Sequence, residues 1–206
     1  MRSIFLIILT AAVITSCNKI ETKKPWNIKI EDGSELYDYS GVTYPSADGW
    51  SASFQSFSGF QINGNNEVTS FNTKSQFSVK FGNFSGLNFN LIFNTNDSLT
   101  LVNLNSAKPH SVRFQAFNQV VKKGTYSFTS MPNSPFIFYT DKQDNLWVTD
   151  FSQNNFLEVI STTPNTQDAT ANELIAQINF DLGLKGFSSN STKRIKGTIF
   201  SFFTLN

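Results

Sequence analysis

The sequence predicts an all-β fold, an antiparallel β-sandwich of about ten strands. Apolar and polar residues alternate at a period of two along much of the chain. Turn-type clusters rich in Asn, Asp and Gly recur about every 8–12 residues, the spacing of short strands joined by turns. The 22 phenylalanines, set among many serines and asparagines, suit an aromatic core beneath a neutral polar surface.

The strands are expected to follow one another from residue 26 onward. Trp26, Ile28 and Ile30 share one face of the first strand, which ends at Asp32-Gly33. Further alternating runs are found at residues 77–81, 89–93, 99–101, 112–116, 126–128, 136–138 and 146–148. No segment sustains a helical period, and only residues 168–174 are expected to form a short helical turn. A closed, lipocalin-like β-barrel is the alternative, because short strands in series suit both architectures.

The last third of the chain has the clearest strand pattern. Apolar residues at 178, 180, 182 and 184 lie on one face of a long predicted strand. A polar loop over residues 188–193 leads to a final strand from Ile195 to Leu205. Both faces of that strand are apolar near Phe200, Phe202 and Phe203, which predicts a place inside the sheet or over a second core.

The N-terminus has the layout of a secretory signal peptide over residues 1–16. Arg2 precedes an apolar run that is too short to cross a bilayer, which needs about 20 residues. Ser16 stands directly before Cys17, the only cysteine. This arrangement resembles the lipobox of bacterial lipoproteins, and the resemblance implies cleavage before Cys17 and acylation of its thiol. The alternative is an ordinary signal peptide whose cysteine merely lies near the cut.

Three segments follow from this reading: a signal peptide (1–16), a lipidated cysteine with a polar tether (17–25), and a single all-β domain (26–206). Asn18 is not the Asp that retains well-studied Gram-negative lipoproteins in the inner membrane. The resemblance therefore implies an outer-membrane location, with acyl chains holding the protein on the membrane. Glu21 is the only acidic residue among three lysines of the tether, so periplasmic and surface orientations both stay open.

The closing strands resemble those of small, uncharacterised Bacteroidota lipoproteins. Residues 124–128 read Gly-Thr-Tyr-Ser-Phe, similar to a GTY-x-F strand of that family. Residues 178–182 and 195–202 are similar to its closing strand pair. The resemblance supports the location and the β-fold and implies no catalytic residues. Ile199 is an insertion relative to the family pattern, and we expect a bulge there.

Charge and composition exclude several functions. The chain has 16 Lys+Arg and 15 Asp+Glu, and loss of Arg2 with the signal peptide leaves 15 of each. A neutral chain without a basic stripe is not expected to bind nucleic acid. Low charge also makes a β-domain prone to edge-to-edge pairing. With Cys17 acylated and His110 the only histidine, the sequence predicts no metal, no cofactor and no enzymatic activity.

Candidate binding residues gather before residue 51. Four aromatic residues there are set among Gly and Pro and lie near Asp38 and Asp48; they are Tyr37, Tyr39, Tyr44 and Trp50. Aromatic rings on irregular backbone next to carboxylates are typical of a stacking platform for sugars. The alternative is that these rings cap one end of the β-core.

Two short motifs have alternative interpretations. Asp97-Ser98-Leu99 matches the pattern at which Bacteroidota O-glycosylate exported proteins, and a plain Asp-Ser turn is the alternative for Ser98. The run from Asp141 to Asn145 has oxygen donors for calcium but not the order of an EF-hand loop, so a hairpin turn is favoured.

The sequence thus favours a lipid-anchored, non-enzymatic β-domain that binds a glycan, a peptide or an envelope complex. A barrel that carries an apolar ligand in a Phe-lined cavity is the second hypothesis. The third is a glycan enzyme built on two carboxylates about 5–10 Å apart, with Asp38, Asp48, Asp141, Asp144, Asp150 and Glu158 as the available acids.

Overall fold

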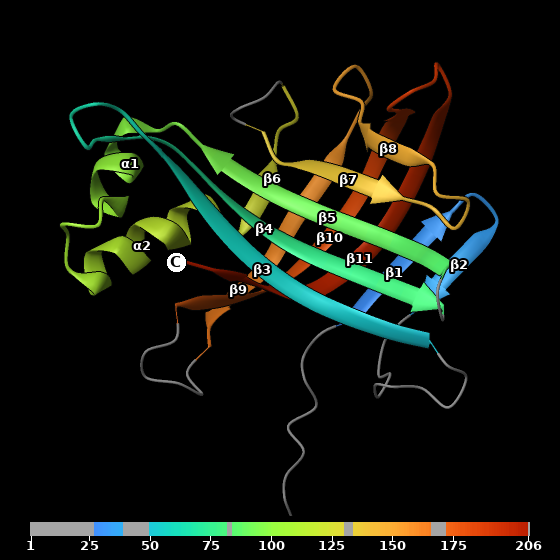
Figure 1. Cartoon of the computed structure of the whole chain (residues 1–206), viewed down its shortest axis with the longest axis horizontal. Helices are drawn as coiled ribbons and strands as arrows, with labels where there is room; N and C mark the ends of the chain where they lie inside the picture. The colour runs from blue at the N-terminus through green and yellow to red at the C-terminus, as the bar shows by residue number, and fades with distance from the viewer. Residues whose placement is uncertain (1–26, 39–49, 82–83, 130–133, 166–171, 206) are drawn as a thin grey trace, which may run out of the picture.

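The computed structural model describes residues 27–38, 50–81, 84–129, 134–165 and 172–205. Most of them form one antiparallel sheet that curls strongly into a half-barrel, with two short helices at one end (Figure 1). The elements are β1 Asn27–Asp32, β2 Glu35–Asp38, β3 Trp50–Ile62, β4 Val68–Phe81, β5 Phe84–Thr95, α1 Ser98–Leu104, α2 His110–Val120, β6 Gly124–Tyr126, β7 Phe136–Thr140, β8 Leu146–Thr149, β9 Phe156–Pro164, β10 Glu173–Gly186 and β11 Thr192–Thr204.

Nine strands follow one hydrogen-bonded path in the order β2-β1-β11-β10-β8-β7-β5-β4-β3. β9 branches from β10, and β6 pairs with β9. β10 therefore has two neighbours along one edge: β9 beside residues 174–181, and β8 beside residues 184–186. The predicted antiparallel β-architecture is confirmed. The strands belong to one curled sheet instead of two stacked ones, because β10 continues past β9 and pairs onward with β8.

Two of the predicted strands are wrong, because residues 98–104 and 110–120 are helices. Their buried residues have helical spacing: Leu101 and Leu104 in α1, and Ala116, Phe117 and Val120 in α2. Asp97 caps α1, accepting a hydrogen bond from the backbone N–H of Thr100 at 2.8 Å. Helices of two or three turns are too short for their period to be distinguished from alternation.

The other predicted strands are present, and the structure adds β2, β3 and β9. The bulge expected at Ile199 is wrong. Ile199 pairs in regular register with Ile28 of β1 and Ile178 of β10. The irregularity in this region lies one strand away, between Gln177 and Ile178 in the β10–β9 ladder. In the predicted helical turn, residues 168–171 lie outside the described residues and Glu173 already belongs to β10.

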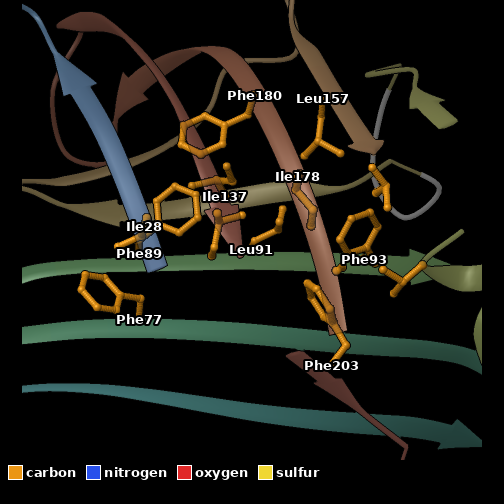
Figure 2. Packing of buried hydrophobic residues seen from close by; sticks show 14 of the residues in the cluster. Ile28, Phe77, Phe89, Leu91, Phe93, Ile137, Leu157, Ile178, Phe180 and Phe203 are labelled. Atoms are coloured by element: carbon orange, nitrogen blue, oxygen red, sulfur yellow. The ribbon is translucent and has the colours of Figure 1, made fainter. Parts of the chain in front are cut away.

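The inside of the curl is filled by apolar side chains, many of them phenylalanines (Figure 2). Phe89 of β5 stacks on Phe180 of β10 with ring centroids 5.2 Å apart. Phe93 makes edge contacts with Tyr126 at 5.0 Å and with Phe203 at 5.3 Å. These contacts join the β3–β5 part of the sheet to the β10–β11 part, so the predicted Phe-packed core is confirmed.

The end of β11 reaches β3 and β4 through hydroxyl groups, which we call the hydroxyl seam (Ser56, Ser58, Ser75, Ser201 and Thr204). Thr204 donates its backbone N–H to Ser56 Oγ at 2.8 Å and accepts from Ser58 Oγ at 2.7 Å. Ser75 and Ser201 are both fully buried and bond to each other. The seam joins distant parts of the sheet by side-chain contacts, while Phe203 on the same strand enters the core.

Candidate functional site

A groove of about 470 Å³ lies along β1, β2, β10 and β11. Its lining residues are Asn27, Lys29, Asp38, Gln177, Thr198, Ile199 and Phe200. Side chains alternate between the two faces of a strand, and Ile28, Ile178 and Ile199 are fully buried on the inner face. The groove residues that directly precede or follow these isoleucines in the strands, such as Asn27, Gln177 and Phe200, therefore have their side chains on the outer face of the sheet, away from the core.

Strand register gives the arrangement of the groove floor. Phe200 of β11 lies opposite Asn27 on β1 and opposite Gln177 on β10. One step along, Thr198 lies opposite Lys29, which in turn lies opposite Asp38 of β2. The half-buried ring of Phe200 is thus flanked by the side-chain amides of Asn27 and Gln177. The hydroxyl of Thr198, the ammonium of Lys29 and the carboxylate of Asp38 lie in the next row of the same face.

This set of side chains suits a neutral polar ligand with one apolar face. The amides and the hydroxyl both donate and accept hydrogen bonds, while the ring of Phe200 offers a flat apolar surface. Lys29 and Asp38 bring opposite charges to the same groove, so it does not select for an anion or a cation. Apolar surface combined with a few placed polar groups is the usual composition of a small-molecule site.

Of the predicted stacking residues, the structure describes the side chain of Tyr37 alone. Tyr37 is buried, 6% exposed, and its hydroxyl donates to Glu35. Lys142 Nζ lies 4.5 Å from its ring centroid, so the ring packs against the protein. Tyr39 and Tyr44 lie outside the described residues, as does the side chain of Trp50. Tyr37 also lies in a regular strand, β2, and not on irregular backbone.

The other predicted sites are found on the surface or outside the described residues. Ser98 is exposed in the first turn of α1, directly after its cap Asp97. The backbone N–H of Thr100 holds the pKa of Asp97 below its usual value. Cys17 and the segments 1–16 and 17–25 lie outside the described residues. In the ranges that are described, no helix is long and apolar enough to span a membrane.

A second arrangement of polar groups is centred on the Lys193 ammonium. Lys193 Nζ lies 2.9 Å from Asp32 Oδ2 and 3.2 Å from Asp141 Oδ2. Tyr139 donates its hydroxyl to Asp32 at 2.9 Å, and the Trp147 indole donates to Asp141 at 2.8 Å. Lys193 also lies 4.3 Å from the Trp147 ring centroid. We call these five residues the lysine cluster.

Burial and hydrogen bonding act oppositely on Asp141. Burial alone would raise the pKa of its carboxyl, but hydrogen bonds from Trp147, Asn145 and Lys193 outweigh it and hold the pKa below the usual range. Tyr139 has a raised pKa, because burial and the nearby Asp32 carboxylate disfavour its phenolate. The Lys193 ammonium thus lies between the side chains of Asp32 and Asp141.

The turn predicted at Asp141 to Asn145 is confirmed. The Asp141 N–H donates to the Asn145 carbonyl at 3.1 Å, and Asp141 Oδ1 accepts from the N–H groups of Gln143 and Asn145 at 3.0 Å. Its oxygens are therefore used by the β7–β8 turn and by the lysine cluster. In the described part of the chain, no group of three or more His, Cys, Asp or Glu is placed to hold a metal ion.

Asp150 and His110 have hydrogen-bond partners outside the groove lining. Asp150 accepts from the backbone N–H of Ser152 at 3.0 Å and from its hydroxyl at 2.7 Å, and these bonds lower the pKa of Asp150. Asp48 lies outside the described residues. His110 begins α2, not a strand; its ring bonds to Asn172 and stacks on Phe114.

Sequence reasoning found Asp38 and missed the rest of the groove. Phe200 was recognised only as one of several apolar residues on a strand with two apolar faces. The available signal was the alternation of side chains along β11, since Ile199 and Phe203 point inward while Phe200 points outward. Its neighbours Asn27 and Gln177 are brought beside it only by the register with β1 and β10.

Comparisons with family models, with curated proteins and with solved structures found no significant match, so the groove is interpreted from its own geometry.

Proposed function

We propose that this protein is a lipid-anchored, non-enzymatic binding domain of the cell envelope whose groove holds a carbohydrate. The observation that carries the proposal is the half-buried Phe200 ring between the amides of Asn27 and Gln177. A sugar ring has an apolar face that stacks on an aromatic ring and hydroxyls around its rim that need donors and acceptors. The groove supplies both within one depression of about 470 Å³.

The predicted anchor is consistent with an envelope ligand. Asn27 at the groove follows Cys17 by ten positions in the sequence. A chain of that length spans at most about 35 Å when fully extended. An acylated Cys17 would therefore keep the groove close to the membrane surface, where envelope glycans are concentrated.

The two alternative functions have less support. An apolar-ligand carrier needs an empty cavity inside the curl, whereas buried side chains such as Phe89, Phe180 and Leu91 pack there. A carboxylate-dependent enzyme needs two facing acids with room for a glycosidic oxygen between them. Asp32 and Asp141 do face one site, but the Lys193 ammonium occupies it.

Glycan-array binding of the full-length protein, followed by calorimetry on the best ligand, tests the proposal. Phe200→Ala should weaken binding about tenfold, because it removes the stacking surface. Gln177→Ala should also weaken binding, since it removes a donor and an acceptor from the exposed rim. Phe187→Ala is the matched control, because Phe187 is 65% exposed in the loop after β10 and away from the groove residues.

Each outcome bears on the proposal. Wild-type protein that binds no carbohydrate on the array would refute the ligand class. Binding that is unchanged in both groove variants would refute the site. Circular dichroism of each variant separates lost binding from lost folding.

A further inference from the structure

β3 is the last strand at one end of the hydrogen-bonded path of the sheet (Figure 1). Its 13 residues pair with β4 from Trp50 opposite Phe81 to Ile62 opposite Val68. Within the described ranges, no strand pairs with its other side. At about 3.4 Å per residue this edge is roughly 44 Å long. Such a row of backbone N–H and C=O groups is a template for another strand.

The other edges of the sheet carry the usual protection against pairing. β2 has four residues, and two of them, Glu35 and Asp38, are charged. β6 has three residues and directly follows Lys122 and Lys123. Short length and charge are the common means by which natural sheets block edge pairing. β3 differs, since its sequence WSASFQSFSGFQI contains no charged residue and no proline.

β3 is already ordered by contacts within its own domain. The β4 ladder fixes one side of β3, and Thr204 bonds to Ser56 and Ser58 on its inner face. The single irregularity in the β3–β4 ladder lies at its end, between Gln61 and Ile62. A strand that is already ordered loses little conformational entropy when it pairs.

We propose that β3 pairs with β3 of a second copy of this chain, antiparallel across a two-fold axis. An antiparallel strand pair is self-complementary, so one edge suffices for a closed dimer. Like charges opposite each other would oppose such pairing, and β3 has none. A charged strand from another protein would find no charged side chain on β3 itself, whereas a second β3 is neutral throughout.

The outward side chains favour a register centred near Phe57. Phe57 lies near the middle of β3 and is 45% exposed. In that register two Phe57 rings meet across the dyad, and opposed aromatic rings stabilise antiparallel pairs. Lys74 of β4 lies 4.8 Å from the Phe57 ring centroid and covers the ring from within its own sheet.

Analytical ultracentrifugation of the full-length protein in density-matched detergent, over a range of concentrations, tests the dimer. Wild-type protein should change from monomer to dimer as concentration rises. Phe57→Lys should weaken the dissociation constant about tenfold or more, because it places two ammonium groups opposite each other. Phe156→Lys is the matched control, since Phe156 is 41% exposed on β9, and it should dimerise like wild type.

Gln55→Lys is a second variant on the same outward face, in case Phe57→Lys does not fold. A wild-type protein that stays monomeric up to its solubility limit would overturn the proposal. So would a dimer that survives both substitutions, or an open-ended series of larger assemblies. None of these results depends on whether the groove binds carbohydrate.

Discussion

The ammonium group of Lys193 connects three parts of the chain that are distant in sequence. Asp32 precedes the β1–β2 turn, Asp141 begins the β7–β8 turn, and Lys193 follows the β10–β11 turn. Each hairpin thus contributes one charge to the cluster. The sequence predicted the turn at Asp141 from its Asp and Asn residues, but a contact between residues 161 positions apart has no local signal.

Acid should destabilise the protein through Asp141. The pKa of this carboxyl is lowered in the folded state, so the unfolded chain binds its proton more readily. The stability it contributes is present above the ordinary Asp value of about 3.9 and is lost as pH falls through the folded-state pKa. Asp141→Asn should cost about 1–3 kcal/mol at pH 7, and its urea midpoint should vary less with pH in the acid range.

Asp144→Asn is the control for this prediction. Asp144 is exposed in the same turn and has a φ of 61°, a conformation that Asn tolerates well. At pH 7 its loss of stability should be smaller than that of Asp141→Asn, because the Asp144 side chain is exposed. An Asp141→Asn variant with the wild-type pH dependence would mean that the Asp141 charge does not act in the fold.

At the scale of elements, period-two alternation predicts where the long strands lie but not how they pack. Period-two alternation located β10 and β11 within a few residues of their observed bounds. The same reasoning took α1 and α2 for strands, because the few apolar residues of a short helix fit either period. The role of Gly197 was also hidden, since it depends on how closely β1 approaches β11.

Gly197→Ala should destabilise the domain by about 1–3 kcal/mol or more. A Cβ there would lie 2.0 Å from the Lys29 carbonyl oxygen and 2.8 Å from Phe180 Cζ. Since the nearer atom belongs to the backbone, β1 itself must move to relieve the clash. Urea unfolding measures the loss, and hydrogen exchange should show reduced protection of β1.

Gly59→Ala is the matched substitution in another strand. A Cβ at Gly59 would meet only the Asn72 side chain, at 3.5 Å, which is ordinary contact. Its stability should stay within about 0.5 kcal/mol of wild type. Equal costs for the two alanines would show that close packing of β1 on β11 is not what requires Gly197.

At the scale of the whole molecule, the half-barrel lies between the predicted sandwich and the alternative barrel. Alternation predicts that each strand has an inner and an outer face, and it does so correctly for β1, β4, β5 and β10. It does not predict which strand lies beside which. The fork at β10 and the hydroxyl seam both depend on contacts far apart in sequence. So does the groove, which joins β1 and β2 near the start of the described chain to β10 and β11 near its end.

The proposed membrane anchor of the whole protein depends on Cys17. Cys17→Ser should abolish incorporation of an alkynyl fatty acid and move the protein from the membrane fraction to the soluble fraction. Two or more acyl chains give stable anchoring, whereas a single chain binds reversibly. Ser16→Thr, which keeps the cysteine, should still label. A Cys17→Ser protein that remains labelled or membrane-bound would contradict the anchor.

The pairing of β1 with β11 also fixes when the domain can finish folding. Chains emerge from the ribosome N-terminus first, and Ile28 pairs with Ile199, near the far end of the sequence. Until residues 192–204 emerge, β1 has only the four-residue β2 beside it, and an isolated two-stranded hairpin is marginal in water. β1 therefore stays without its long partner strand through nearly all of the synthesis of the chain, and the sheet can close only after β11 has been made.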